Sequence, residues 1–203
     1  MVSSADSQSA DPGSSPGSGT NQEEKKMEQL YKCFQHWGNS VWVYSDPHFG
    51  EADMKIHFNY PDDDQQMKNI NAKVGKNGTI IFLGDIGDIN YIKKVRGYKI
   101  LVMGNHDVGH TIYEQVFDEV YAGPVFVGEK ILLSHARIDF PNAFNFHGHD
   151  HAGWGSENNS MNCCANILNF QPFCLNKFIK NGGLSKIVNF NRSLTDNAIK
   201  RKG

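Results

Sequence analysis

Short apolar runs in the first half of the chain predict buried strands separated by helices. Residues 41–44, 79–83 and 98–103 are rich in branched and aromatic side chains, which is typical of buried strands. Residues 61–75 and 89–97 carry apolar side chains at helical spacing instead, and each segment ends at a glycine. The order strand, helix, strand, helix, strand is the βαβαβ pattern of a parallel sheet, so we expect an α/β protein.

The second half of the chain is richer in short strands. The elements predicted there are strands at 120–121, 124–127, 130–133, 145–146 and 162–168, followed by a helix over 175–180. A tight turn at Gly128 and Glu129 joins the second and third of these strands. The sequence contains no internal repeat, and we treat both halves as one domain.

The two ends of the chain differ in composition from the part between them. Residues 1–20 hold seven Ser, three Gly and two Pro, a composition that buries too little apolar surface to offset the entropy of ordering. We therefore expect a disordered tail over residues 1–26, a domain over 27–182 and a loosely ordered polar tail over 183–203. The pattern leaves open whether the first tail is native or an added leader before a natural start at Met27.

Composition and charge exclude several classes of protein. Twenty Lys and Arg against 22 Asp and Glu, a net charge of -2, leave no overall basic field, so there is no strong signal for nucleic-acid binding. No apolar run reaches the ~18 residues of a membrane span, and the amino terminus lacks the pattern of a secretory signal. Four cysteines are too few for a disulfide framework in 203 residues. We expect a cytoplasmic protein with no membrane partner.

A cluster containing Asp or His follows each of five predicted strands. These clusters are Asp46-Pro47-His48, Gly84-Asp85, Gly104-Asn105-His106-Asp107, Ser134-His135 and Gly148-His149-Asp150-His151. In open α/β sheets ligands bind beyond the carboxyl ends of the strands, so these loops are expected to meet at one edge. Imidazole, carboxylate and amide groups are ligands for Mn²⁺, Fe²⁺ or Zn²⁺. Because seven such ligands exceed the need of one ion, we predict two ions about 3.5–4 Å apart, bridged by a carboxylate.

The order of these motifs resembles that of the calcineurin-like metallophosphoesterase superfamily. Residues 46–50 match the DxHFG opening of small bacterial-type members, and GDxxD, GNHD, SH and GHxH follow in order within residues 41–180. The resemblance implies a four-layer αββα sandwich of two mixed β-sheets flanked by helices. It also implies a phosphodiester or phosphomonoester substrate, which is hydrolysed with a metal-bridging hydroxide as nucleophile.

The resemblance also implies roles for individual residues. The implied ligands of one metal are Asp46, His48 and His151. The implied ligands of the other are Asn105, His135 and His149, with Asp85 bridging the two. His106 is implied as the catalytic acid or transition-state stabiliser. We place Asp107 beside it in the catalytic pair, as the group that orients the ligands or His106. The implied cofactor is a pair of divalent ions, Mn first, with Fe, Zn or Ni as alternatives.

Some positions near the motifs are less specific. Three residues are candidates for orienting the ligands or contacting the substrate, namely Asp88, His147 and Arg137. His147-Gly148-His149 also reads as H-x-H, but the family pattern favours His149 and His151. Glu51 stands where small relatives often have His or Asn, and residues 136–138 lack their proline-containing motif. The substrates of close relatives therefore do not transfer to this chain.

Two alternatives stay open beside the esterase. Some relatives of this fold have lost catalytic residues and serve as binding scaffolds, but here His106 and all the implied ligands are present. Larger nucleases of the superfamily carry extra DNA-binding segments, and about 140 core residues leave little room for them. The sequence decides neither the native metal, nor monoester against diester preference, nor the oligomeric state.

Overall fold

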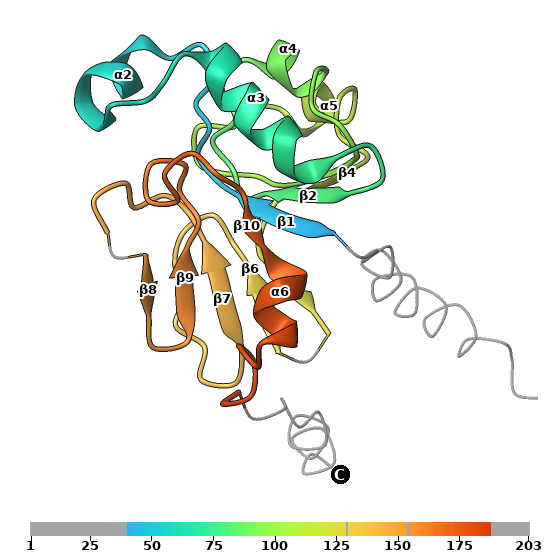
Figure 1. Cartoon of the computed structure of the whole chain (residues 1–203), viewed down its shortest axis with the longest axis vertical. Coiled ribbons are helices and arrows are strands. Elements are labelled where there is room, and N and C mark those ends of the chain that lie inside the picture. Colours follow the sequence, from blue (N-terminus) through green and yellow to red (C-terminus); the bar gives the residue numbers. More distant parts are fainter. Residues whose placement is uncertain (1–39, 129, 154, 188–203) are drawn as a thin grey trace, which may run out of the picture.

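Two stacked β-sheets form the centre of the molecule (Figure 1). A computed structural model describes residues 40–128, 130–153 and 155–187 of the chain. Each sheet has five strands and contains both parallel and antiparallel pairs. The expectation of an α/β fold with two mixed sheets and flanking helices is confirmed.

The first sheet has the order β10-β1-β2-β3-β4. Its strands are β1 (Val41–Tyr44), β2 (Thr79–Phe82), β3 (Tyr98–Val102), β4 (Glu119–Tyr121) and β10 (Phe173–Cys174). The first four are mutually parallel neighbours, and β10 pairs antiparallel with β1. The predicted βαβαβ unit therefore lies in this sheet, and the carboxyl ends of β1, β2 and β3 share one edge.

The second sheet has the order β5-β6-β7-β9-β8. Its strands are β5 (Val125–Val127), β6 (Ile131–Leu133), β7 (Phe144–His147), β8 (Ser156–Glu157) and β9 (Ser160–Asn162). The strands β6, β7 and β9 are parallel, whereas β5 and β8 are antiparallel to their neighbours at the two edges. The carboxyl ends of β6 and β7 consequently point the same way.

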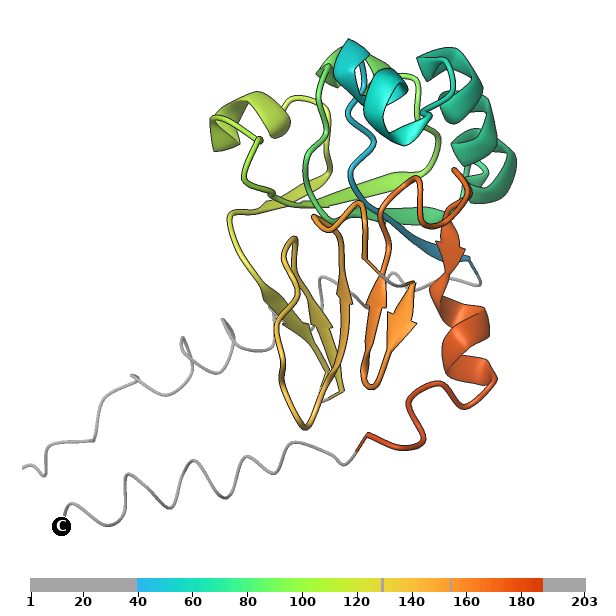
Figure 2. The ribbon, with the colours of Figure 1, turned by 90° about the vertical axis from the view of Figure 1, so that its left-hand side faces the viewer.

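Four helices cover the first sheet on the face away from the second sheet (Figure 2). They are α2 (Ala52–Phe58), α3 (Asp63–Val74), α4 (Ile89–Ile92) and α5 (His110–Tyr113). The helix α3 buries Met67, Ile70 and Val74, the apolar stripe that its spacing predicts. It ends at Gly75, whose φ of 63° is a conformation that glycine adopts without strain.

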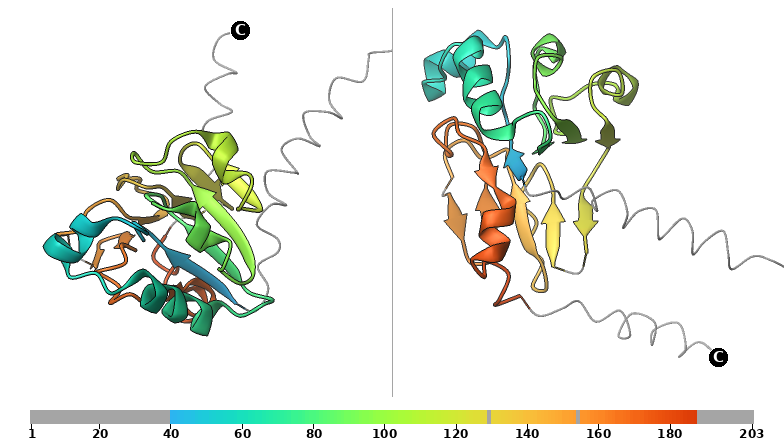
Figure 3. Two further views of the ribbon diagram at one scale, coloured as in Figure 1. Left: turned by 90° about the horizontal axis from the view of Figure 1, so that it is seen from above. Right: turned by 45° about the vertical axis from the view of Figure 1, so that its right-hand side comes forward.

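A fifth helix, α6 (Leu175–Lys180), lies beside β10 and the second sheet (Figure 3). Its Phe178 ring lies 4.7 Å from that of Phe144 and 5.4 Å from that of Phe146, both on β7. Leu175 is fully buried in the same cluster. The helix therefore closes one side of the space between the sheets.

Alternating side chains of the first sheet enter two separate cores. Val41 and Val43 of β1 face the second sheet and join a cluster with Phe146, whereas Tyr44 joins the cluster beneath the helices. The strand β2 divides in the same way. Ile81 joins the cluster between the sheets, and the residues on either side of it join the cluster beneath the helices. The first sheet is thus covered on both faces, which explains its continuous apolar strands.

The expected strand over 162–168 is wrong in extent. The strand β9 ends at Asn162, and Cys164 then makes only an isolated bridge with Ser45. The Asn162 carboxamide accepts a hydrogen bond from the Cys164 backbone N–H, a local bond that competes with strand pairing. Beyond it the chain turns, with positive φ at Asn169 and Phe170. The short elements α2, α5, β8 and β10 were not predicted.

The expected segment boundaries are only partly open to comparison. The tail over 1–26, the start of the domain at 27 and residues 188–203 lie outside the described residues, as does Glu129 of the expected turn. Leu184 and Ile187 pack against the core between the sheets, so the packed part of the chain extends past the expected boundary at residue 182. Within the described segments, no helix has the length and apolar character needed to cross a bilayer.

We expect Phe146→Ala to lower the free energy of unfolding by about 3–5 kcal/mol, because a fully buried ring leaves a cavity between the sheets. Phe126→Ala is the matched control, since that ring is 47% exposed, and its loss should stay near 1 kcal/mol or below. Urea unfolding measures both. Equal losses for the two variants would contradict the placement of the core.

Candidate metal centre

Five loops from both sheets converge at one edge of the sandwich. Asp46 and Asp85 follow β1 and β2, the segment 105–107 follows β3, His135 follows β6, and the segment 149–151 follows β7. Backbone hydrogen bonds tie these loops together. The Asp46 N–H donates to the Gly84 carbonyl at 3.0 Å, and the Gly148 N–H donates to the His135 carbonyl at 2.7 Å.

Several candidate ligands have an unusual backbone conformation. The φ angles are 55° at Asp46, 44° at His48, 52° at Asp85 and 69° at His149. Residues other than glycine rarely adopt this left-handed region, and a histidine there is under strain. Such strain concentrates at functional sites and persists only where the surroundings enforce it. The surrounding loops therefore hold these residues in a left-handed backbone conformation that directs their side chains inward.

Two glycines allow the loops to approach this closely. A Cβ atom on Gly84 would lie 2.6 Å from both the Gly104 backbone and the His135 Nδ1, closer than atoms can pack. Gly84 also has a φ of 101°, which favours glycine. The glycines of the GD and GNHD motifs are thus needed for backbone contact between the two loops.

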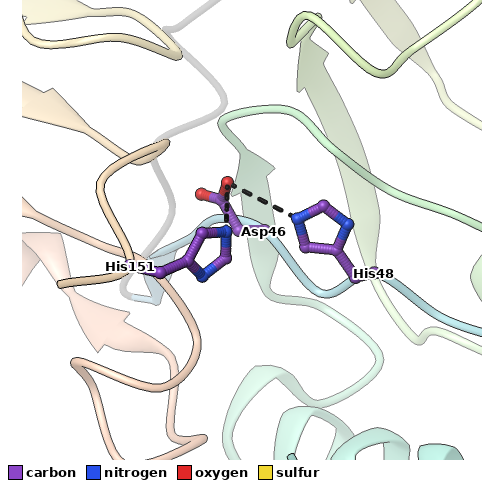
Figure 4. Close-up of side chains that lie close together, drawn as sticks. All are labelled: Asp46, His48 and His151. Atoms are coloured by element: carbon purple, nitrogen blue, oxygen red, sulfur yellow. Dashed lines mark ion pairs between the residues drawn. The ribbon is translucent and has the colours of Figure 1, made fainter. Parts of the chain in front are cut away.

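The first cluster consists of Asp46, His48 and His151 (Figure 4). The Asp46 Oδ1 atom lies 3.9 Å from the His48 Nε2 and 3.5 Å from the His151 Nε2. Asp46 is fully buried, and both histidine side chains are largely buried. The three ligand atoms surround one point that is shielded from solvent.

The second cluster consists of Asp85, His135 and His149, with Asn105 beside them. The His135 Nε2 atom lies 2.7 Å from the Asn105 Oδ1, 3.1 Å from the His149 Nδ1 and 3.3 Å from the Asp85 Oδ2. The His135 Nδ1 donates to the Leu83 carbonyl at 2.8 Å, and a carbonyl can only accept. This bond directs the Nε2 lone pair into the cluster, where a cation can satisfy all four atoms.

Asp85 joins the two clusters. Its Oδ2 atom lies 3.3 Å from the His135 Nε2 and 3.8 Å from the His48 Nε2. Its Oδ1 accepts a hydrogen bond from the His106 backbone N–H at 2.9 Å. One carboxylate therefore faces ligand atoms of both clusters, which is the position of a bridging ligand.

The donor set fits divalent cations. Two buried side-chain atoms in the described part of the chain have no hydrogen-bond partner, and these are the Asp46 Oδ1 and the His48 Nε2. They belong to the same cluster and face each other. A buried polar atom without a partner is costly, and a cation between these two atoms would satisfy both. These donor atoms therefore suit a positively charged ligand.

Mutual contacts shift the proton affinities of two candidate ligands. Burial lowers the pKa of His135, but its hydrogen bond to the Asp85 carboxylate and the charges of Asp46 and Asp85 outweigh it, so the net pKa is raised. Burial raises the pKa of Asp85, but hydrogen bonds from His135 and the His106 N–H outweigh it, so the net pKa is lowered. The two opposite shifts share one cause, the attraction between the Asp85 carboxylate and the His135 imidazole.

Asp107 anchors two ligand loops rather than facing the centre. Its Oδ2 accepts from the backbone N–H groups of Asp85 at 3.0 Å and Gly104 at 2.8 Å. Its Oδ1 accepts from the Ile86 N–H at 3.0 Å and the Tyr113 hydroxyl at 2.9 Å. Four donors surround this buried carboxylate and tie it to the loops that follow β2 and β3. Its assignment to the catalytic pair with His106 stays a prediction.

His106 lies exposed beside the first cluster. Its ring centre is 5.8 Å from that of His48, in an edge-to-face arrangement. Its backbone N–H is held by Asp85, as described above. The imidazole therefore lies between the first cluster and solvent.

The three less specific candidates have other contacts. Asp88 is exposed and caps α4, where its Oδ1 accepts from the Asn90 N–H at 2.9 Å. His147 is buried at the end of β7 with its Nδ1 3.1 Å from the Gly148 carbonyl, and burial lowers its pKa. Arg137 forms an ion pair with Asp139 at 3.5 Å. The described contacts do not bring any of them into the two clusters, and the cap on α4 accounts for Asp88.

Sequence reasoning missed two residues that hold Asp46. The Tyr60 hydroxyl donates to the Asp46 carbonyl at 2.7 Å, and the Cys164 thiol donates to the Asp46 Oδ2 at 3.3 Å. Burial raises the pKa of both groups, so both stay protonated as donors. Neither belongs to a metal-binding motif, and the sequence predicts Cys164 only as a buried residue within a strand. Only their positions in space reveal the contact.

A groove of about 730 Å³ lies apart from this centre. It is bordered by Trp42, Lys73, Phe173 and Lys177, which come from β1, α3, β10 and α6. None of the residues of the two clusters lines it. The buried atoms without a hydrogen-bond partner and the candidate ligands with left-handed backbone lie in the two clusters and not around this groove.

Comparison with known proteins agrees with this picture. The family model for calcineurin-like phosphoesterases matches residues 40–201. A search of curated proteins finds no match. The chain is similar to the crystal structure of AQ665, a protein of unknown function from Aquifex aeolicus, with a TM-score of 0.57 and 21% sequence identity. The match covers 69% of this chain and 97% of that one, and it supports the fold alone.

We expect Asp107→Asn to lower the free energy of unfolding by about 2 kcal/mol, because the new amide would set a donor against backbone N–H groups. Urea unfolding of the metal-free protein measures this loss. Tyr113→Phe removes one of the four donors to Asp107 and should cost about 1 kcal/mol. Unchanged stability with a lost catalytic rate would support the catalytic role of Asp107.

We expect Mn²⁺ affinity to rise with pH as His135 loses its proton. The raised pKa means that the protonated form persists above the ordinary value of about 6.5 and competes with the cation. The same proton stabilises the metal-free fold below about 6.5, and that contribution is lost as pH rises through the raised pKa. Titration calorimetry at several pH values checks the affinity, and His135→Asn should flatten its pH dependence. A steep dependence retained in His135→Asn would assign the proton to another group.

Proposed function

This chain belongs to the calcineurin-like phosphoesterase family, and we propose that it hydrolyses phosphate esters with two divalent cations. Asp46, His48 and His151 would hold one cation, and Asn105, His135 and His149 would hold the other. Asp85 would serve both. Mn²⁺ is the first choice, because mixed imidazole and oxygen ligands suit it, with Fe, Zn and Ni as alternatives.

One observation carries the proposal. The Asp46 Oδ1 and the His48 Nε2 are buried without a partner and face each other, while Asp85 faces both clusters. A binding scaffold gains nothing from such atoms, because they cost free energy unless a cation satisfies them. The donor set therefore favours a working metal centre over a scaffold that keeps only the fold.

The charge of the ligands suits an anionic substrate. Asp46 and Asp85 carry the two negative charges of the ligand set, and Asn105 binds through a neutral oxygen. Two divalent cations bound there supply Lewis-acid stabilisation of phosphoryl oxygens and acidify water. Because four positive charges exceed two negative ones, the loaded centre attracts a phosphate group.

His106 is the residue placed to move a proton. Its exposed imidazole lies beside His48, and the Asp85 carboxylate fixes its backbone. In its protonated form it donates a proton to the leaving oxygen, or a hydrogen bond to the charge that develops on the phosphoryl group. Both roles need an imidazole that exchanges protons with solvent, which agrees with its exposure.

We expect metal-stripped protein to hydrolyse bis(p-nitrophenyl) phosphate only after Mn²⁺ is added. His106→Ala should lower the rate by about 10²–10⁴-fold because the proton donor is lost. His110→Ala is the matched control, since that histidine pairs with Glu114 outside the two clusters and should leave turnover intact. p-Nitrophenyl phosphate in parallel reports the preference between monoesters and diesters.

Two results would argue against the proposal. Turnover that survives metal removal or Asp85→Asn excludes the metal centre as its source. Absence of turnover on both esters by protein that binds two Mn²⁺ ions favours the scaffold.

A further inference from the structure

We propose that Glu51 is a positioning residue that holds His48 ready for metal binding, an inference that rests on the proposed metal centre. The His48 Nδ1 donates to the Glu51 Oε2 at 2.9 Å. Glu51 stands at a position where small phosphoesterases of similar sequence often have His or Asn.

The contact with Glu51 decides which nitrogen of His48 is available. A carboxylate only accepts, so the proton sits on Nδ1 and the lone pair on Nε2. That Nε2 is the buried atom without a partner, 3.9 Å from the Asp46 Oδ1 and 3.8 Å from the Asp85 Oδ2. Glu51 therefore aims the metal-binding lone pair at the space between the two carboxylates.

The local backbone leaves the Glu51 side chain available for its contact with His48. Glu51 occupies the position before α2, but its side chain makes no capping hydrogen bond to that helix. Its N–H donates to the His48 carbonyl at 3.1 Å, which closes a tight turn between the two residues. At the far end of α2, the Phe58 ring lies 4.8 Å from that of His151. The two ends of α2 thus contact two candidate ligands, since Glu51 bonds to His48 and Phe58 packs against His151.

A carboxylate behind a ligand differs from a carbonyl. The His135 Nδ1 faces the Leu83 carbonyl, whereas the His48 Nδ1 faces a charged oxygen. Carboxylates behind metal-bound histidines raise the basicity of the ring and fix its orientation, and their loss lowers metal affinity by about 10–100-fold. The charged acceptor behind His48 therefore supports its ring more strongly than the carbonyl behind His135 does.

The exposure of Glu51 separates positioning from a structural role. Its side chain is 40% exposed, and exposed ion pairs add little to folding stability. Removing the carboxylate should leave the metal-free fold unchanged while weakening one metal site. Metal affinity is thus a readout that a merely structural role would not move.

The test is Mn²⁺ binding to metal-stripped protein by titration calorimetry. We expect Glu51→Ala to weaken one of two binding events by about 10–100-fold and to leave the other unchanged. Glu51→Gln should recover part of the loss, because its amide oxygen still accepts from the His48 Nδ1. Asp53→Asn is the matched control, since it removes the same charge from an exposed position on α2 and should bind as the unaltered chain does. Thermal unfolding of each metal-free variant checks the fold.

Each outcome decides the inference. Unchanged affinity in Glu51→Ala overturns it. An equal loss in Asp53→Asn also overturns it, because general electrostatics then explains the effect. An unaltered chain that binds no Mn²⁺ overturns the proposed function and this assignment together. Selective loss at one site, with partial rescue by Gln, supports it.

Discussion

The structure depends on one electrostatic constraint, the crowding of metal-binding lone pairs at a buried edge of two sheets. The His48 Nε2 faces the Asp46 Oδ1 and the Asp85 Oδ2, and neither the His48 nor the Asp46 atom has a partner. Atoms with lone pairs repel one another when burial removes water from between them. A cation bound between these atoms would turn this repulsion into attraction.

The two sheets supply the stiffness that this arrangement needs. Left-handed backbone at Asp46, His48 and Asp85 costs about 1 kcal/mol or more at each residue. The surroundings offset this cost through the four donors on Asp107, through the Tyr60 hydroxyl on the Asp46 carbonyl and through the inter-loop backbone bonds. Two cores hold these loops from opposite faces of the first sheet. Contacts within the protein therefore hold the candidate ligands in place without a bound cation.

The sequence predicts the parts of this design that are local. Buried strands such as Thr79–Phe82 are continuous apolar runs, and motif order brings the candidate ligands into two clusters. The short elements β8 and α5 escaped prediction because two to four residues carry no periodicity and form only where tertiary contacts support them. The contact between Cys164 and Asp46 escaped for another reason. The two residues lie 118 positions apart, and no spacing encodes such a contact.

The two clusters differ in the groups that accept hydrogen bonds from their histidines. The ligand motifs alone do not show this difference. The first cluster carries the fully buried Asp46 and a histidine backed by the Glu51 carboxylate. The second relies on the neutral Asn105 and a histidine backed by the Leu83 carbonyl. More negative charge therefore surrounds the first cluster, while Asp85 serves both. If both clusters hold cations, the more negative first cluster would bind its cation more tightly, because Coulomb attraction is stronger there.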